Sequence, residues 1–482
     1  MTEKIESPPA HHPNALERLT SLVTGEEPPA TPTTGEYHTN YVFARLREDK
    51  PPPGRYHMWG MLAALYLVMF LAGWNDGTQG PLLPSLQEYY NINYLVISII
   101  WVFNMLGFLL AGLTNVFLTD RFGFGIVAPF GAMCQVLGYI FMCWGPPYPL
   151  FCFAFVCSGY GLGLQDAQVN TMASRLPNAN NLLFLMHAVY GLGATASPLV
   201  ATQFVKHVRS KVYYYYFVSL GLGLATAVTL LVVFQLRTED QVAGRRVEDH
   251  PESVPQAVTE TETKSDGEGG AEVAAPAART VKTGPTSSGS KMKQIMRISA
   301  THYMALFILL YVGVEVGIGG WATSFLIAER GGGDSSGYVS AGYFGGLTIG
   351  RVVLIPVTNF IGKRLATHVF TLLCIALMVV VWTVKSLIGN AVAYAFVGVF
   401  LGPMYPIVMI VILDVMPFEL QAGTIGWIAS LGQVGSAFMP FVTGAISQKH
   451  GVWILQPLMI SIMGVWMVCW ALVPRTRVQQ RA

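Results

Sequence analysis

Twelve long runs of predominantly apolar residues follow one another along the 482-residue chain. A helix that crosses the hydrocarbon core of a membrane needs about 20 such residues. Each run reaches that length, and polar turns or longer polar segments separate the runs. We therefore expect transmembrane helices over residues 57–83, 94–118, 124–143, 149–170, 182–204, 212–236, 300–328, 338–361, 366–388, 390–413, 422–446 and 452–473.

Two long polar segments divide the chain around these runs. Residues 1–56 contain scattered prolines, and residues 237–299 are rich in Glu, Thr, Gly and Pro. Such composition buries too little apolar surface to fold, so we expect a disordered tail and a mostly disordered linker. The predicted parts are the tail 1–56, a six-helix half 57–236, the linker 237–299, a second half 300–473 and a C-terminal tail 474–482.

The composition agrees with an all-α multi-pass protein surrounded by a lipid bilayer. Hydrophobic residues make up 52% and charged residues 12% of the chain, whereas soluble domains carry about 25% charged residues. A net charge of +2 gives no bulk positive charge for nucleic acid. The six cysteines show no metal-ligand spacing, and no nucleophile–base pair or phosphate loop is visible. We expect neither an enzyme nor a bound cofactor or metal.

The basic residues predict the orientation in the membrane. If the N-terminus is cytoplasmic, 22 of the 29 lysines and arginines lie on the cytoplasmic side and six on the other. Cytoplasmic loops carry the excess of basic residues in membrane proteins. Both termini and the linker are therefore predicted to be cytoplasmic, and without a retention signal the plasma membrane is the expected location.

The two halves show signs of a duplication. Residue pairs in corresponding places are separated by 239 or 242 positions: Asp76 and Glu315, Asp120 and Asn359, Gly123 and Gly362, Gly193 and Gly435, and Pro198 and Pro440. Parallel repeats of six spans are the organisation of the major facilitator superfamily. The turn Leu118-Thr119-Asp120-Arg121-Phe122-Gly123 resembles a cytoplasmic loop signature of that superfamily.

That loop resemblance implies a gating role for Asp120 and Arg121, which would tie neighbouring helices together in one conformation. A second interpretation remains open. The turn can simply be a charged segment that keeps the loop in the cytoplasm.

Charged residues inside the spans are the strongest functional candidates, because each costs ~2.5–3.5 kcal/mol at a helix centre. Asp76, Asp166, Glu315 and Arg351 lie well inside spans. Each acid can instead be a hydrogen-bonding residue between packed helices. Arg351 can be a partner for one of the acids or lie near the cytoplasmic end of its span.

Other polar and aromatic residues in the spans suggest a sugar site. Pyranose rings stack on aromatic side chains, and their hydroxyls need amide and carboxylate partners. Plain helix packing is the alternative for each. The predicted substrate-binding residues are Asn75, Asp76, Gln79, Asn104, Asp166, Asn170, His187, Tyr190, Glu315, Trp321 and Gln433.

Two motifs resemble the fucose–galactose–glucose:proton symporter family of the superfamily. The first is Asn75-Asp76 followed by Pro81-Leu82-Leu83-Pro84, where Gly77, Gly80 and Pro81 are expected to loosen the helix. The second runs from Gly161 through Gln165-Asp166 to Asn170. The resemblance implies sugar as the substrate class and proton coupling by Asp76 and Asp166.

A membrane carboxylate can bind a proton near neutral pH, because burial disfavours its charged form. Protonation would let the loaded carrier reorient by rocking its two halves around a midplane site. A uniporter, a sodium-coupled carrier and a non-transporting nutrient sensor remain alternatives. Accumulation of substrate against its gradient would separate them.

Overall fold

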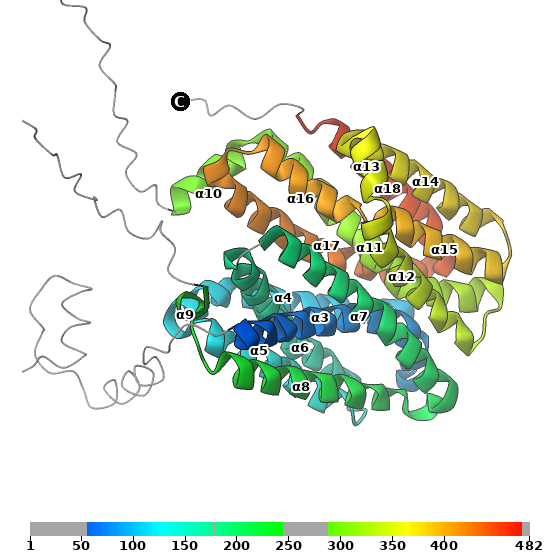
Figure 1. Ribbon diagram of the computed structural model, residues 1–482. Helices are drawn as coiled ribbons and strands as arrows, with labels where there is room; N and C mark the ends of the chain where they lie inside the picture. The colour runs from blue at the N-terminus through cyan, green and yellow to red at the C-terminus, as the bar shows by residue number, and fades with distance from the viewer. Residues whose placement is uncertain (1–54, 177–178, 244–287, 475–482) are drawn as a thin grey trace, which may run out of the picture. The chain divides into compact units, whose positions relative to one another are not determined.

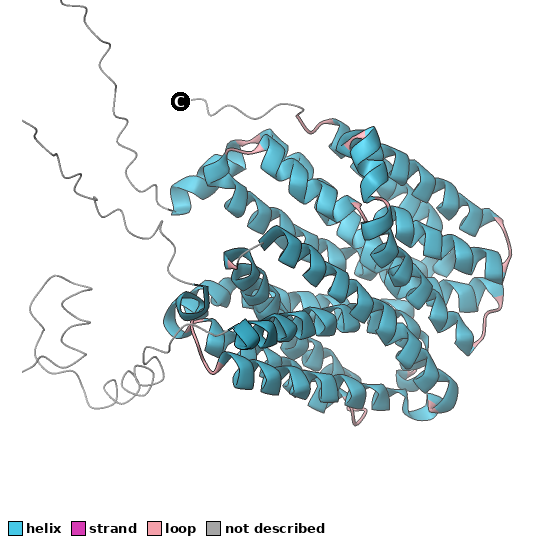
Figure 2. Ribbon diagram, viewed as in Figure 1, coloured by secondary structure: helices cyan, strands magenta, loops and turns pink. Residues whose placement is uncertain are grey.

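The computed structural model describes residues 55–176, 179–243 and 288–474, and the elements within these ranges are helices joined by loops (Figure 2). The predicted tail 1–56 lies almost wholly outside the described residues, and the C-terminal tail 474–482 lies outside them except for Pro474. Residues 244–287 of the linker also lie outside them.

The first half consists of long helices, coloured blue to green in Figure 1. Their length follows from unbroken apolar runs, which need a hydrogen-bonded backbone to enter a bilayer. They are α3 (Arg55–Tyr90), α4 (Tyr94–Phe122), α5 (Phe124–Met142), α6 (Tyr148–Arg175), α7 (Ala179–His207), the 3₁₀ helix η1 (Arg209–Tyr215) and α8 (Tyr216–Phe234).

The second half repeats this arrangement with more interruptions, coloured green-yellow to red in Figure 1. Its elements are α11 (Ser299–Arg330), η3 (Asp334–Gly337), α12 (Tyr338–Val353), α13 (Ile355–Ile361), α14 (Lys363–Thr383), α15 (Leu387–Leu401), α16 (Met404–Val415), α17 (Phe418–His450), η4 (Val452–Ile454) and α18 (Leu455–Ala471).

The predicted all-α membrane fold is confirmed. Within the described residues, ten helical segments are long and apolar enough to cross a membrane, or eleven when a bent pair counts as one span. The remaining predicted span, 182–204, lies in the 29-residue helix α7. One helix, or two helices in succession, therefore lies along each of the twelve predicted ranges within the described part of the chain.

Two of the predicted continuous spans are broken in the structure. The span 338–361 bends by 53° between α12 and α13, just before Pro356. The span 390–413 is interrupted between α15 and α16 at Gly402 and Pro403. Proline lacks the backbone N–H that would continue the hydrogen-bond ladder and clashes with the preceding turn, which explains both breaks.

The linker is helical at both described ends, where we expected mostly disorder over 237–299. The helices are α9 (Glu239–Ala243) and α10 (Ser288–Arg297). Asp240 pairs with Arg175 of α6 at 2.5 Å, and Ile295 of α10 is buried against α17. Both ends contain apolar residues that the average composition of the linker conceals. We call the end of the bundle that holds α9 and α10 the linker end.

Glycines let α3 and α7 approach each other closely. A side chain at Gly73 would collide with the carbonyl of Tyr190, and one at Gly193 would collide with the carbonyl of Phe70. Small residues at such contacts allow backbones to pack tightly in membranes. This contact fixes Tyr190 of α7 beside the middle of α3.

We expect Gly193→Ala to lower the melting temperature of the purified protein clearly, because the added methyl group must push α7 away from α3. Overpacking of this kind costs about 1–3 kcal/mol. Gly221→Ala in α8 is the matched control, since no atom lies within 4 Å of the added methyl group. Equal melting temperatures for the two variants would contradict the close contact.

Candidate functional site

The predicted coupling residue Asp76 lies on α3 and faces α7. The hydroxyl of Tyr190 donates a hydrogen bond to Oδ2 of Asp76. Asp76 is also within electrostatic range of Asp166 on α6 and Glu315 on α11. The structure thus brings together three carboxylates and Tyr190, all predicted site residues, from both halves of the chain.

The glycines beside Asp76 do not loosen the helix, as we had expected. The 36-residue helix α3 runs through Gly77, Gly80, Pro81 and Pro84 without a break. Side chains at Gly77 and Gly80 would collide with the carbonyls of Ala194 and Gly319. The expectation was wrong because these glycines serve contacts with neighbouring helices.

A network of amide side chains surrounds Asn75. Its Nδ2 donates to Oε1 of Gln135 at 3.1 Å, and the hydroxyl of Tyr139 donates to its Oδ1 at 2.7 Å. Nε2 of Gln135 donates to Oε1 of Gln165 at 2.5 Å. Gln135 and Gln165 are fully buried. The sequence did not assign Gln165 or Tyr139 to the site, although a glutamine inside an apolar span is a usable signal.

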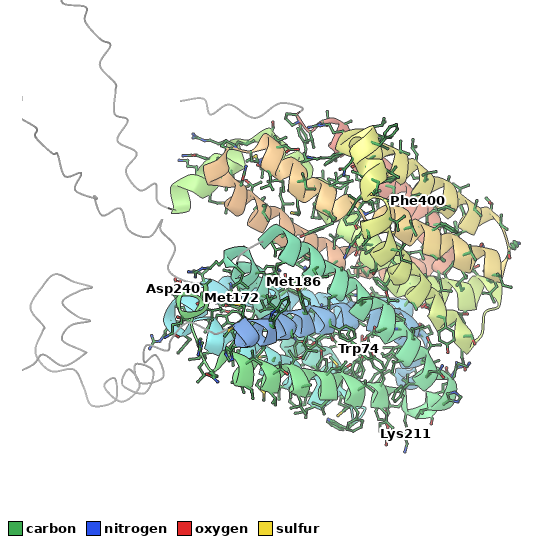
Figure 3. The ribbon with its side chains drawn as sticks, in the orientation of Figure 1. Trp74, Met172, Met186, Lys211, Asp240 and Phe400 are labelled. Carbon is green, nitrogen blue, oxygen red and sulfur yellow. The ribbon has the colours of Figure 1, made fainter. Side chains whose placement is uncertain are left out.

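Trp74, which directly precedes Asn75 and Asp76, anchors α3 to α8. The indole Nε1 of Trp74, labelled in Figure 3, donates to Oγ of Ser219 at 3.1 Å. Its ring stacks on Tyr215 at 5.9 Å between centroids. Trp74 therefore holds Asn75 and Asp76 in place through packing.

A small cavity of about 20 Å³ lies within the first half. It is large enough for about one water molecule, and far below the ~300–1,000 Å³ of typical ligand pockets. Four predicted site residues, from α3 and α4, are brought together here. The lining residues are Asn75, Asp76, Thr78, Gln79, Asn104, Met142, Phe155, Ser158, Leu162 and Tyr216.

Asp166 and Asn170 form a pair on α6. Nδ2 of Asn170 donates to Oδ1 of Asp166 at 3.0 Å and to its backbone carbonyl at 2.8 Å. Asp166 is also within electrostatic range of Tyr405 on α16. Asn170 therefore orients the carboxylate of Asp166 in this conformation.

Arg351 is a partner of an acid, which was one of the two alternatives left by the sequence, and it also lies in the last turn of α12. Its Nη2 lies 3.7 Å from Oε1 of Glu315, and the two side chains are only 10% and 9% exposed. Nη1 donates to the backbone carbonyl of His187 at 3.3 Å. The guanidinium lies 5.9 Å from the ring centroid of Tyr190. The ring of His187 is 6.4 Å from that of Tyr405.

Other predicted residues lie outside this cluster. Trp321 is fully buried, donates to the carbonyl of Pro440 at 3.0 Å and packs on Trp101. Gln433 is half-buried on α17. Asp120 and Arg121 are exposed at the end of α4, and the guanidinium of Arg121 lies 5.8 Å from the ring centroid of Phe122.

The halves are joined by polar contacts at the end opposite the linker end. Nη1 of Arg209 lies 2.5 Å from Oδ1 of Asp334 in the second half, and its Nη2 lies 2.6 Å from Oε2 of Glu88 in the first. Gln203 of α7 donates to the hydroxyl of Tyr338 at 2.5 Å. These contacts connect the two halves at that end in the present conformation.

Two bundles of membrane helices that meet around carboxylates and a guanidinium are the arrangement typical of secondary transporters. The model of the Major Facilitator Superfamily matches residues 65–440. The chain belongs to this superfamily, whose members are transporters and not enzymes, as the sequence predicted.

Comparisons with individual proteins extend this result. The chain is 25% identical over 425 residues to "Bypass of stop codon protein 6" of Saccharomyces cerevisiae, covering 85% of this chain and 81% of the yeast protein. It is 27% identical over 154 residues to a glucose/galactose transporter of Brucella abortus, covering 31% of this chain and 36% of that protein. A D-xylose–proton symporter matches in structure with a TM-score of 0.66 at 11% identity, covering 87% of this chain and 98% of that one.

Proposed function

We propose that the protein is a secondary active symporter that moves a sugar or similar small polar solute together with protons. The observation that carries the proposal is the environment of Asp76. Its carboxylate accepts a hydrogen bond from Tyr190, lines the small cavity of the first half and, within the described residues, forms no ion pair. A half-buried acid inside a membrane span, without a fixed cation, is well suited to take up and release a proton.

The coupling follows from the cost of a charge in a low-dielectric interior. The ionised Asp76 opposes closure of the site around it, whereas the protonated form removes that cost. Asp166 contributes a second titratable group within electrostatic range. A carrier with proton and solute bound can then reorient, and the empty ionised carrier is held back.

Sugar as the substrate class is supported by the amide network and by a relative. Asn75 and Gln79 line the cavity, and Gln135 lies behind Asn75. Amides and carboxylates are the groups that sugar hydroxyls require. The Brucella relative, similar over part of its length, is called a glucose/galactose transporter. We also propose cytoplasmic termini and a plasma-membrane location, from the distribution of basic residues.

Uptake of labelled hexoses, pentoses and deoxysugars into proteoliposomes tests the proposal. We expect one or more sugars to accumulate only when a pH gradient is imposed. Equilibration without accumulation would indicate a uniporter, and accumulation driven by a sodium gradient would indicate sodium coupling. Well-reconstituted protein that moves no member of the panel would overturn the sugar assignment and favour the sensor.

We expect the middle of the linker to be dispensable for transport. Its composition predicts no packing on the helices, whereas α9 and α10 should be kept because they contact the bundle. Replacing 244–287 by a shorter flexible connector should leave the apparent affinity for substrate unchanged in uptake measurements. A variant that expresses well but loses uptake would favour a regulatory or sensing role instead.

A further inference from the structure

The guanidinium of Arg351 is buried between the two halves with donors to spare. Its side chain is 10% exposed. Among the residues that the structure describes, it makes one hydrogen bond, to the backbone carbonyl of His187 at 3.3 Å, and its Nε has no partner. The 3.7 Å separation from Glu315 is longer than a hydrogen bond. A guanidinium carries five N–H donors, so most of its capacity is unused.

A second arginine shows how this fold satisfies a guanidinium with a structural role. Arg330, at the end of α11, donates to three backbone carbonyls, those of Glu329, Val381 and Trp382, at 2.8–3.1 Å. It also lies 4.7 Å from the ring centroid of Phe325. In the described part of the chain, Arg351 has no comparable set of acceptors. Because a poorly paired buried charge is unfavourable, its spare donors point to a group that arrives during the transport cycle.

The charges around Arg351 indicate what that group is. Arg351 and Glu315 offset each other, while Asp76 lies within electrostatic range of Glu315 and of Asp166. Within the described residues, neither aspartate forms an ion pair. An anionic solute would add a further negative charge to this site, whereas a neutral solute adds none. The planar fork of arginine suits two neighbouring oxygen atoms.

We propose that Arg351 is a substrate-binding residue of the second half, which donates hydrogen bonds to two adjacent hydroxyl oxygens of a neutral sugar. The inference rests on the proposed function and adds the substrate chemistry. Asp76 and its amide neighbours would hold the solute from the first half. Since Arg351 already touches His187 of α7, a solute bound to it is held by both halves when they move.

Binding of sugars to the purified full-length protein by calorimetry tests the proposal. The first measurement compares D-glucose, D-galactose, D-xylose and L-fucose and identifies the sugar that binds best. The monodeoxy analogues of that sugar and its uronic acid are then measured. The variants are Arg351→Lys and the double variant Arg351→Met with Glu315→Gln, in which Glu315 does not lose its cationic partner while keeping its own charge. Arg330→Lys is the matched control, because this arginine lies away from the carboxylates.

In the wild type we expect removal of either of two adjacent hydroxyls to weaken binding about tenfold to a hundredfold, the scale of a hydrogen bond to a charged group. The double variant should bind the parent sugar about tenfold to a hundredfold more weakly than the wild type does. It should bind the two deoxy analogues no more weakly than it binds the parent sugar. In Arg351→Lys, removal of only one of the two hydroxyls should still weaken binding. In Arg330→Lys, removal of either hydroxyl should weaken binding as it does in the wild type. The uronic acid should bind the wild type more weakly than the parent sugar.

Three results would overturn the inference. If removal of either hydroxyl weakens binding to the double variant as much as it weakens binding to the wild type, Arg351 does not contact those hydroxyls. If the double variant binds every analogue more weakly than the wild type by the same factor, Arg351 acts on the fold or the electrostatic field of the site and does not contact the two hydroxyls. Tighter binding of the uronic acid would assign an anionic substrate. In these cases the proposed function stands, whereas absence of sugar binding to the wild type overturns both.

Discussion

Asp76→Asn is expected to abolish pH-driven accumulation of substrate while the protein remains folded in the membrane. Asparagine has nearly the same shape and can still accept the hydrogen bond from Tyr190, but it carries no titratable proton. The site then behaves as if permanently protonated, so reorientation no longer requires proton binding. Uptake into proteoliposomes with an imposed pH gradient measures the loss.

A second measurement separates uncoupling from inactivation. Exchange of labelled for unlabelled substrate across the liposome membrane should persist in Asp76→Asn, because exchange needs no net proton movement. Asp414→Asn is the control, since this acid pairs with Lys363 at 2.7 Å and is half exposed. Normal accumulation by the Asp76 variant would remove this residue from the coupling mechanism.

Asp166→Asn is expected to weaken substrate binding by ~1–3 kcal/mol, the scale for leaving buried polar groups poorly paired. It should also flatten the pH dependence of binding, because the titrating group has been removed. Asp166→Glu restores the acid with one more methylene group and should keep part of the affinity. Calorimetry between about pH 5 and 8 covers the range in which a desolvated carboxylate titrates.

The structure sharpens what the opposite outcome would mean. Asn170 donates to Asp166 at 3.0 Å, and an asparagine at position 166 could still accept that bond. If the Asn variant binds substrate as the wild type does and differs only in thermal stability, Asp166 is a helix-packing residue. Asn170→Ala is a useful companion, because it frees the carboxylate of Asp166 without removing the charge.

The tertiary structure changed the meaning of several residues that the sequence had singled out. Gly77 and Gly80 were expected to loosen α3, yet they are contact points for α7 and α11. Trp321 was assigned to the sugar site, and it packs on Trp101 between the halves. Gln165 was quoted in a motif but was not assigned to the substrate site, and in the structure it accepts a hydrogen bond from Gln135. Each difference depends on what lies opposite the residue on another helix.

By itself, the sequence determined that this protein is an all-α membrane protein with about twelve spans, with carboxylates at positions 76, 166 and 315 in their interior. These properties follow from the apolar run length and from the cost of a charge in a bilayer, both of which can be evaluated along a single segment. Only the tertiary structure decided that Arg351 pairs with Glu315, that Tyr190 donates to Asp76 and that proline breaks α12 from α13 within one span. Contacts between separate helices depend on how the helices cross. Hydrophobic patterning constrains which face of a helix is buried, but it does not specify which helix packs against that face.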